Sequence, residues 1–334
     1  MDESQHIPHA APLSQREGQA AEGLGVSILI PTYNYVCAHL VCELQKQCEE
    51  VQAMYADDFH YEIIVADDGS NDMAAVEKNA AIEYLPNSRY EILDNNIGRA
   101  AIRNWLVNAA KYRWLILMDC DAEVIRDDFV LRYWQAILEK TEQDPEAECI
   151  FIGGTATPST CSSGCELRHR YELAASDIRT LEARRSNPSM YFSTFNFLCS
   201  RSILRQIPFD ERCTEYGYED ALFGIEAERL GFEICHIDNE LLHVGINDNQ
   251  SFLRNSEAAL RTLHKLGKPM TGRANVSRVA SKFTSTPLRR TFLKPLLLIL
   301  YKMSKPFLRK NLLSSAPNLK IFAFYKLGYY LSLK

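Results

Sequence analysis

The chain has 334 residues, of which 46% are apolar, so it is long enough to bury a large core and is neither a disordered polymer nor a miniature scaffold. The formal net charge of −6 conceals an asymmetry, because residues 273–334 contain 13 Lys and Arg residues and no Asp or Glu. With 37 basic and 43 acidic residues in all, the rest of the chain therefore carries a net charge of −19. An acidic body is joined to a strongly basic tail, and we expect the two parts to have different partners.

The cysteines and the apolar runs indicate where the protein is expected to reside. The closest two cysteines, Cys161 and Cys165, lack the two-residue spacing of zinc and redox motifs, so reduced thiols are expected. No export signal opens the chain, which together with free thiols favours the cytosol. The longest apolar stretch near the end, residues 296–301, is far shorter than the roughly 20 residues that span a bilayer, so we expect no transmembrane segment.

Elements of an α/β fold follow a polar lead-in, residues 1–24, that we expect to be disordered. Apolar runs of strand length alternate with amphipathic segments of helical period, which is typical of a parallel sheet covered by helices. The expected strands are 26–30, 61–66, 90–93 and 114–118, and the expected helices are 36–51, 98–111 and 127–140. The second half is mixed, with helices expected at 165–185 and 219–230 and a strand at 191–198.

Two carboxylates, Asp119 and Asp121, follow the fourth apolar run with i, i+2 spacing. Alternate strand residues face the same side, so both can reach one cation in the crevice at the carboxyl edge of the sheet. Oxygen ligands suit Mg²⁺ or Mn²⁺, which usually also hold diphosphate oxygens. In isolation, the same pair would equally suit a solvated loop after a buried strand.

Three further polar loops follow the first three expected strands and lie at the same edge. Acidic side chains there can accept hydrogen bonds from a nucleobase or a ribose, and Gly69 and Gly98 permit tight turns. One such loop would be an ordinary turn, but three of them before the Asp-x-Asp pair predict a nucleotide site. The loops are Pro31-Thr32-Tyr33-Asn34, Asp67-Asp68-Gly69-Ser70 and Asn95-Asn96-Ile97-Gly98-Arg99.

Five segments carry a resemblance to a known family. They are Val26-Ser-Ile-Leu-Ile-Pro-Thr-Tyr-Asn34, Glu62-Ile-Ile-Val-Ala-Asp67-Asp-Gly-Ser-Asn-Asp72, Asn96-Ile-Gly-Arg-Ala-Ala-Ile-Arg103-Asn104, Met118-Asp-Cys-Asp121 and Gly217-Tyr-Glu-Asp220. Through them residues 25–250 resemble the family 2 glycosyltransferases. The resemblance implies a GT-A fold, with a mostly parallel central sheet flanked by helices, and inverting sugar transfer from a nucleotide-sugar donor, usually a UDP-sugar.

The resemblance also implies roles for individual residues. Asp119 and Asp121 would contact the ribose and the metal ion, Mn²⁺ or Mg²⁺. Asn196 resembles a position near the acceptor side of the donor sugar. The expected nucleotide-sugar contacts are Pro31, Thr32, Asn34, Asp67, Asp68, Asn96, Gly98, Arg99, Arg103 and Asp119.

Glu219 and Asp220 open an expected helix and are the predicted catalytic carboxylates. A single-displacement transfer needs one base to take the proton of the acceptor hydroxyl, and the family pattern implies Asp220. The alternative is a pair that only caps the helix. His243 is a candidate third metal ligand, with His236 as its competitor, and either histidine could instead be structural.

These expectations define a domain plan. A catalytic domain covers 25–270, with a nucleotide-binding half at 25–125 and an acceptor-binding half at 126–270. Within the latter, the polar segment 155–189 is a candidate lid and acceptor wall. A basic amphipathic tail at 271–334 carries the C-terminal charge.

The tail is expected to bind an anionic membrane surface. Prolines 295, 306 and 317 cut it into short basic, apolar pieces, and such segments lie in membrane interfaces. Its aliphatic content argues against nucleic acid, and the structural alternative is a helical cap on the catalytic body. We therefore expect a cytoplasmic protein at the inner face of the cell membrane, acting on a glycan or lipid-linked acceptor in bacterial surface polysaccharide synthesis.

Three other functions fit the sequence less well. A haloacid-dehalogenase-type phosphatase expects Thr or Val where Glu123 stands. A sugar nucleotidyltransferase expects a Gly-rich, basic triphosphate loop after the first strand, and none is present. A non-catalytic sugar-binding or scaffold subunit does not require the intact carboxylates at 119, 121, 219 and 220.

Overall fold

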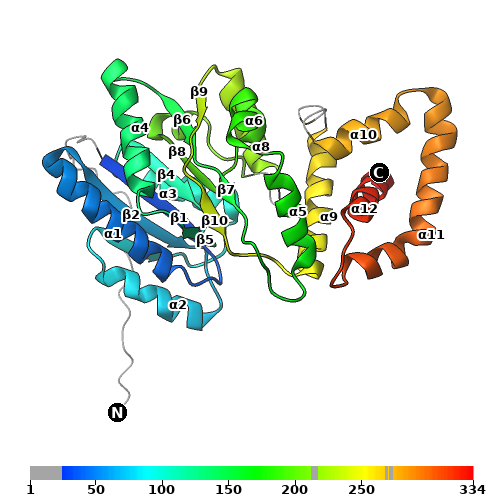
Figure 1. Ribbon diagram of the computed structural model, residues 1–334, viewed down its shortest axis with the longest axis horizontal. Coiled ribbons are helices and arrows are strands. Elements are labelled where there is room, and N and C mark those ends of the chain that lie inside the picture. The colour runs from blue at the N-terminus through cyan, green and yellow to red at the C-terminus, as the bar shows by residue number, and fades with distance from the viewer. Residues whose placement is uncertain (1–24, 212–216, 268–269, 271–273, 334) are drawn as a thin grey trace, which may run out of the picture.

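The computed structural model describes residues 25–211, 217–267, 270 and 274–333. The expected disordered lead-in, residues 1–24, lies outside the described residues. Two sheets and their covering helices make up the body, and further helices follow at the C-terminal end (Figure 1).

The central sheet has seven strands in the order β3-β2-β1-β4-β8-β6-β9. The first four strands in this order run parallel, and β8 is antiparallel to both β4 and β6. The mostly parallel sheet expected from the sequence is therefore confirmed. The strands are β1 (Gly25–Thr32), β2 (His60–Asp67), β3 (Ser88–Ile92), β4 (Trp114–Met118), β6 (Cys149–Ile152), β8 (Asn196–Ser200) and β9 (Glu233–His236).

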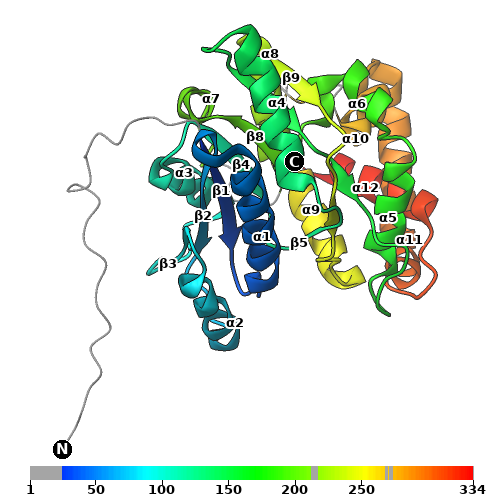
Figure 2. The same ribbon diagram turned by 60° about the vertical axis from the view of Figure 1, so that its left-hand side comes forward.

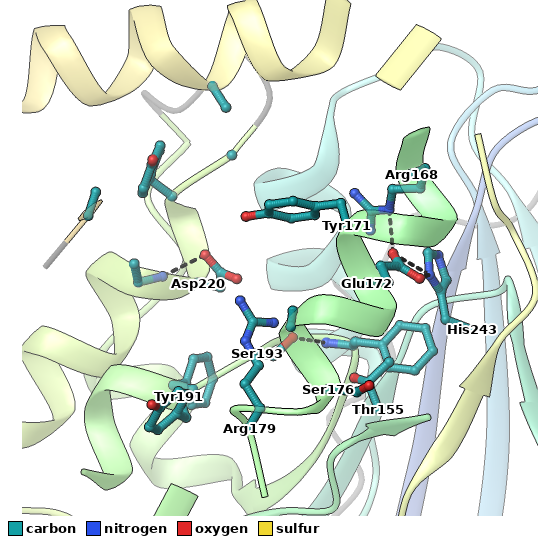
Figure 3. A pocket seen from close by; sticks show the side chains of 18 of the residues that line it. Thr155, Arg168, Tyr171, Glu172, Ser176, Arg179, Tyr191, Ser193, Asp220 and His243 are labelled. Atoms are coloured by element: carbon teal, nitrogen blue, oxygen red, sulfur yellow. Dashed lines mark hydrogen bonds and ion pairs between the residues drawn. The ribbon is translucent and has the colours of Figure 1, made fainter. Parts of the chain in front are cut away.

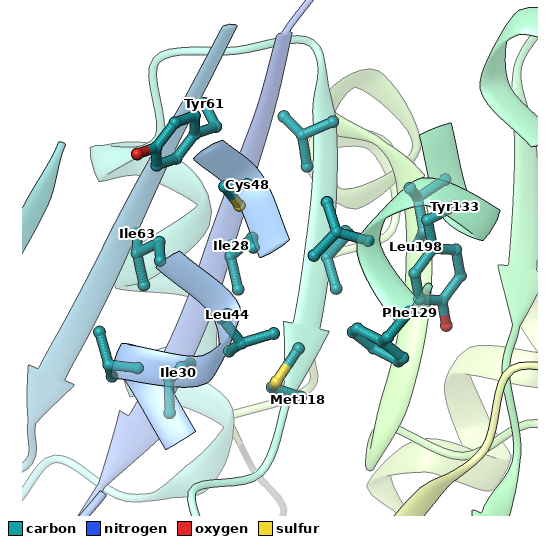
Figure 4. Packing of buried hydrophobic residues seen from close by; sticks show 14 of the residues in the cluster. Ile28, Ile30, Leu44, Cys48, Tyr61, Ile63, Met118, Phe129, Tyr133 and Leu198 are labelled. Atoms are coloured by element: carbon teal, nitrogen blue, oxygen red, sulfur yellow. The ribbon is translucent and has the colours of Figure 1, made fainter. Parts of the chain in front are cut away.

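Successive strand residues pack on opposite faces of this sheet, which explains why the strands read as continuous apolar runs. On β1, Ile28 and Ile30 face the layer of α1 (Ala38–Tyr55) and α4 (Phe129–Gln143), as Figure 4 shows. Leu29 faces the opposite layer. That layer comprises α3 (Arg99–Ala109), α7 (Arg201–Gln206) and α8 (Glu219–Arg229).

A small second sheet joins distant parts of the chain in the order β5-β10-β7. Its strands are β5 (Ala122–Val124), β7 (Thr155–Ala156) and β10 (Leu241–His243). In the antiparallel pairing of β10 with β5, His243 lies opposite Ala122. This pairing brings His243 beside the Asp-x-Asp motif that immediately precedes β5.

Two sequence-based element predictions are wrong in the second half. The expected helix 165–185 is two helices, because Thr180 caps the second one by accepting a hydrogen bond from the Ala183 backbone N–H. The expected strand 191–198 begins only at residue 196, since a 3₁₀ turn occupies the residues before it. The elements are α5 (Glu166–Ser176), α6 (Leu181–Ser186) and the 3₁₀ helix η4 (Pro188–Tyr191).

The remaining elements lie on the connections and in the C-terminal part. They are α2 (Met73–Asn79), α9 (Asn249–Leu266), α10 (Asn275–Thr284), the π-helix η6 (Arg289–Leu293), α11 (Lys294–Leu312), α12 (Leu319–Ser332), and the 3₁₀ helices η2 (Ala56–Asp58) and η3 (Ala80–Tyr84). None of the helices in the described part of the chain has the length and apolarity needed to cross a membrane.

The tail is not cut at each proline, contrary to the prediction. Pro295 lies in the first turn of α11, where it is tolerated, but α11 continues through Pro306. Buried contacts of Tyr301 and Leu312 with α12 lie on either side of that proline and hold the helix together across it. Side chains of α12 in turn pack on α5 and α9, so that α12 lies between α9 and α11 (Figures 1 and 2).

Candidate active site

Most of the predicted donor-site residues surround a cavity of about 300 Å³ at the carboxyl edge of β1 and β4. The turn conformations that the sequence suggested are present, since Gly69 has φ +70° and Gly98 has φ +90°. Tyr33 and Tyr35, which the sequence analysis did not assign, also line the cavity. The predicted residues in its wall are Pro31, Thr32, Asp68, Asn96, Gly98, Arg99, Arg103, Asp119 and Asp121.

Asn34 and Asp67 are not part of this wall. The Asn34 side-chain oxygen accepts hydrogen bonds from the backbone N–H groups of Asn71 and Asp72, each at 2.9 Å. Buried Asp67 accepts a hydrogen bond from the Ser70 N–H at 2.7 Å and another from the Tyr90 hydroxyl. Both side chains therefore hold the loop after β2 in place, a use that their position in the motif did not reveal.

Asp68 joins the loop after β2 to the start of α3. Its two oxygens accept hydrogen bonds from the N–H groups of Ile97 at 2.7 Å and Gly98 at 3.0 Å. Burial nevertheless raises the pKa of the Asp68 carboxyl above its usual value. A β-carbon at Gly69 would lie 2.7 Å from the Asn95 carbonyl carbon, so only glycine permits the two loops to approach this closely.

A buried arginine connects the Asp-x-Asp motif to the start of α8. Arg103 is 2% exposed and donates a hydrogen bond of 2.6 Å to Asp119, while its other terminal nitrogen lies 3.8 Å from a Glu219 oxygen. Burial of the Asp119 carboxyl opposes ionisation, but the guanidinium groups of Arg103 and Arg99 hold its pKa below the usual value. The Asp119 carboxylate is therefore ionised, and its hydrogen bond with Arg103 holds it in one orientation.

Asp121 and His243 face one another across the small sheet. His243 Nε2 lies 3.2 Å from Asp121 Oδ2. His243 Nδ1 lies 3.0 Å from a Glu172 oxygen (Figure 3). Glu172 also accepts a hydrogen bond from Arg168. Burial works against protonation, but the neighbouring carboxylates of Asp121 and Glu172 raise the pKa of His243 to about 9.

These groups fit a divalent cation. Asp121 Oδ1 is buried and has no hydrogen-bond partner among the described residues, and Oδ2 meets an imidazole nitrogen that can also bind a metal ion. No group of three or more His, Cys, Asp or Glu side chains is arranged to hold a metal ion within residues 25–211, 217–267, 270 and 274–333. A cation held by Asp121 and His243 would therefore need further ligands from the diphosphate or water.

The structure distinguishes between the two candidate histidines. His236 is buried on β9, lines neither of the two cavities described here, and lies 3.0 Å from the Pro188 carbonyl oxygen through Nε2 and 3.2 Å from Arg184 through Nδ1. Burial lowers its pKa to about 4. His243 alone of the two is brought to Asp121.

A second cavity, of about 1540 Å³, opens beside the first. Arg99, Asp119 and Asp121 line both cavities, and Glu219 and Asp220 line the larger one. Much of the segment 155–189, the candidate acceptor wall, forms its side, as do parts of α9, α10 and α12. Within this cavity the Arg179 side chain extends toward Asp220 (Figure 3).

The carboxylates at the start of α8 do not cap that helix. The cap position is Tyr218, which has the left-handed φ of 73° after Gly217 at φ 96°, and its side chain makes no capping hydrogen bond. Among the residues that the structure describes, only the neighbouring Ala221 N–H donates a hydrogen bond to the Asp220 side chain, at 2.7 Å. Burial and the adjacent Glu219 charge raise the pKa of Asp220 to about 6.

Asn196 lies in the wall of the larger cavity but is fully engaged. Its side-chain oxygen accepts a hydrogen bond from Tyr133 at 2.7 Å, and its nitrogen donates to the carbonyls of Gly154 and Asn239 at 3.0 and 2.8 Å. With 1% exposure, it braces three segments around the cavity. This geometry gives its amide little freedom to contact an acceptor.

Comparison with known proteins defines the class. The fold is that of GT-A glycosyltransferases. The structure matches a mannosyltransferase from Pyrobaculum calidifontis at a TM-score of 0.50 and 15% identity, covering 92% of this chain and 84% of that one. It matches S. aureus TarS at the same score and identity, covering 90% and 50%. The sequence profile of glycosyl transferase family 2 matches residues 27–207, so the chain belongs to this family.

Two curated relatives are chondroitin synthases. The protein from Pasteurella multocida (strain Pm70) is 26% identical over 234 residues, which cover 61% of this chain and 23% of the relative. The Escherichia coli protein is 37% identical over 98 residues, or 29% of this chain and 13% of the relative. The chain thus spans less than a quarter of the length of these relatives.

Proposed function

We propose that the protein is an inverting glycosyltransferase that moves a sugar from a nucleotide-diphosphate donor, a UDP-sugar, onto an acceptor hydroxyl. The observation that carries this proposal is that a small nucleotide-sized cavity and a large open cavity share Asp119 and Asp121, with Asp220 in the wall of the larger one. A transferase requires two ligands to meet at one point, and the shared wall is such a point.

The donor would occupy the smaller cavity. Asp68 and Asp119 offer carboxylate oxygens to the base and ribose, and Tyr33 and Tyr35 offer aromatic surface. Arg99, which lines both cavities, would contact the diphosphate where the donor reaches the sugar position. The other predicted residues in the wall of this cavity, Pro31, Thr32, Asn96, Gly98 and Arg103, would also contact the donor. Asn34 and Asp67 would instead act by holding the loop after β2 in place.

Asp121 and His243 would hold Mn²⁺ or Mg²⁺, with Asp119 adjacent. A bound cation supplies charge that stabilises the departing diphosphate. The similar mannosyltransferase, whose solved structure is in complex with GDP-Man and Mn²⁺, supports this assignment. Glu172 would fix the His243 ring by accepting a hydrogen bond from Nδ1–H, which leaves Nε2 directed at the metal position.

Asp220 would act as the base. Its pKa of about 6 leaves it ionised at neutral pH yet basic enough to accept a proton from the acceptor hydroxyl. Glu219 lies close to Arg103, which also contacts Asp119. Glu219 would therefore hold the start of α8 in place beside the Asp-x-Asp motif. In-line attack on the anomeric carbon then inverts its configuration, and no covalent sugar–enzyme intermediate is needed.

The acceptor would be a glycan or a lipid-linked glycan for bacterial surface polysaccharide synthesis at the cytoplasmic side of the membrane. The two chondroitin synthase relatives support a polysaccharide product, and a cavity of about 1540 Å³ has room for several sugar residues.

The test is release of UDP from a panel of UDP-sugars with Mn²⁺, Mg²⁺ or EDTA. Metal-dependent turnover of one donor by the wild type, lost in Asp121→Ala and Asp220→Asn, is the expected result. Glu50→Gln, which changes an exposed carboxylate on α1, is the matched control and should turn over normally.

Other outcomes point to the alternative functions. Absence of turnover and binding across UDP-, GDP- and dTDP-sugars would indicate a non-catalytic sugar-binding or scaffold subunit. Pyrophosphate release from a nucleoside triphosphate and a sugar phosphate would indicate a nucleotidyltransferase.

A further inference from the structure

A row of large apolar side chains lies exposed along η6 and α11. Its members recur at intervals of one to four residues, and each is between 44% and 75% exposed. The apolar row consists of Phe292, Leu293, Leu296, Ile299, Leu300, Met303 and Phe307. Isolated exposed apolar residues are normal, but a contiguous row of this kind marks a surface that binds something.

The apolar row is separate from the packing surface of the same helix. Tyr301 and Leu312 of α11 are 2% and 0% exposed and belong to the cluster that joins α11 to α12. Figure 1 shows α11 at the end of the molecule, with α12 between it and α9. One side of α11 therefore completes the fold, while the other side points away from the body.

The elements that carry the apolar row contain only basic charges, because residues 273–334 contain no Asp or Glu. Lys302 and Lys310 are exposed and have no acidic partner among the residues that the structure describes. In contrast, Arg309 is paired, at 3.2 Å, with Glu257 of α9. Exposed basic residues on the same two elements are Arg289, Arg290, Lys302 and Lys310.

We infer that the apolar row is a membrane-binding face that inserts into the interface of an anionic phospholipid bilayer. Basic groups beside an apolar stripe complement anionic head groups above acyl chains. At a rise of about 1.5 Å per residue, the row extends along most of an α11 that is roughly 28 Å long, so the helix would lie parallel to the membrane plane. A second copy of the chain fits the face less well, since pairing would bring two basic tails together.

The test uses the full chain and vesicles of phosphatidylcholine with or without phosphatidylglycerol, separated by flotation. The wild type should float with anionic vesicles, and less so in high salt. Met303→Glu/Phe307→Glu alters two residues that are 73% and 75% exposed, so folding should be unaffected. The affinity of this variant for anionic vesicles should be lower than that of the wild type by about tenfold or more.

The control is Met54→Glu/Tyr84→Glu, which adds the same charge at two residues that are 64% and 89% exposed elsewhere on the molecule. It should float like the wild type. Equal flotation of the two double variants, or no flotation of the wild type, would overturn the inference. So would a dimer, detected by light scattering, that Met303→Glu/Phe307→Glu dissociates without any vesicle binding. The assay needs no sugar donor, so its outcome is independent of the proposed transferase activity.

Discussion

Replacing Asp220 by Asn is expected to abolish sugar transfer and, at the same time, to stabilise the folded protein at neutral pH. The pKa of this carboxyl is raised from 3.8 to about 6 by burial and by the Glu219 charge. Because the raised pKa favours the protonated form in the folded state, ionisation of Asp220 destabilises the folded protein increasingly between pH 3.8 and about 6, and the full cost is present above about 6. At about 1.4 kcal/mol for each pH unit of difference, the cost is roughly 3 kcal/mol at most.

Three measurements test the role of Asp220. Loss of a general base should lower kcat by about 10²- to 10⁴-fold in Asp220→Asn. In the wild type, kcat/KM should fall about tenfold for each pH unit below about 6, since the base must be ionised. The thermal midpoint of Asp220→Asn should exceed that of the wild type by about 2–6 °C at pH 8, and this difference should vanish near pH 4.

An Asp220→Asn variant that keeps more than about a tenth of the wild-type kcat would show that Asp220 is not the base. A stabilisation that does not change between pH 4 and pH 8 would also contradict the prediction, because it would have a cause other than ionisation. Glu50→Gln, on an exposed part of α1, should change neither quantity.

Three further predictions concern the surroundings of the site. Glu172→Gln should weaken Mn²⁺ binding about 10–100-fold in calorimetry with UDP present, because Glu172 orients His243; unchanged Mn²⁺ affinity would show that it does not. Gly245→Ala should abolish metal-dependent turnover while the circular dichroism spectrum stays native, because the added β-carbon would lie 2.2 Å from Asp121 Oδ2; full activity would mean that the carboxylate can move freely. Arg103→Met should lower the unfolding free energy in urea by about 3–5 kcal/mol, because Asp119 loses its hydrogen-bonded partner and buried Glu219 loses the guanidinium beside it; a loss below about 1 kcal/mol would contradict this.

The local sequence pattern was sufficient to predict those strands and helices whose bounds depend mainly on their own residues. The strand 114–118 was predicted at its observed bounds, because its apolar residues are buried on both faces of the sheet. The loops after β1, β2 and β4 could be placed at one edge because parallel strands end together. Pro306 shows the limit, since the rule that proline ends a helix is outweighed by packing that only α12 supplies.

By itself, the sequence determined the sheet, the edge at which its polar loops meet and most of the residues that line the smaller cavity, because these depend on short-range periodicity and motif spacing. Only the tertiary structure shows that His243, and not His236, lies beside Asp121, because that placement depends on the pairing of β10 with β5. It also revealed Glu172, whose spacing from Arg168 resembles any helical ion pair until α5 is placed against β10. Partners more than 70 residues apart in the chain leave no local signal, since only folding brings their side chains together.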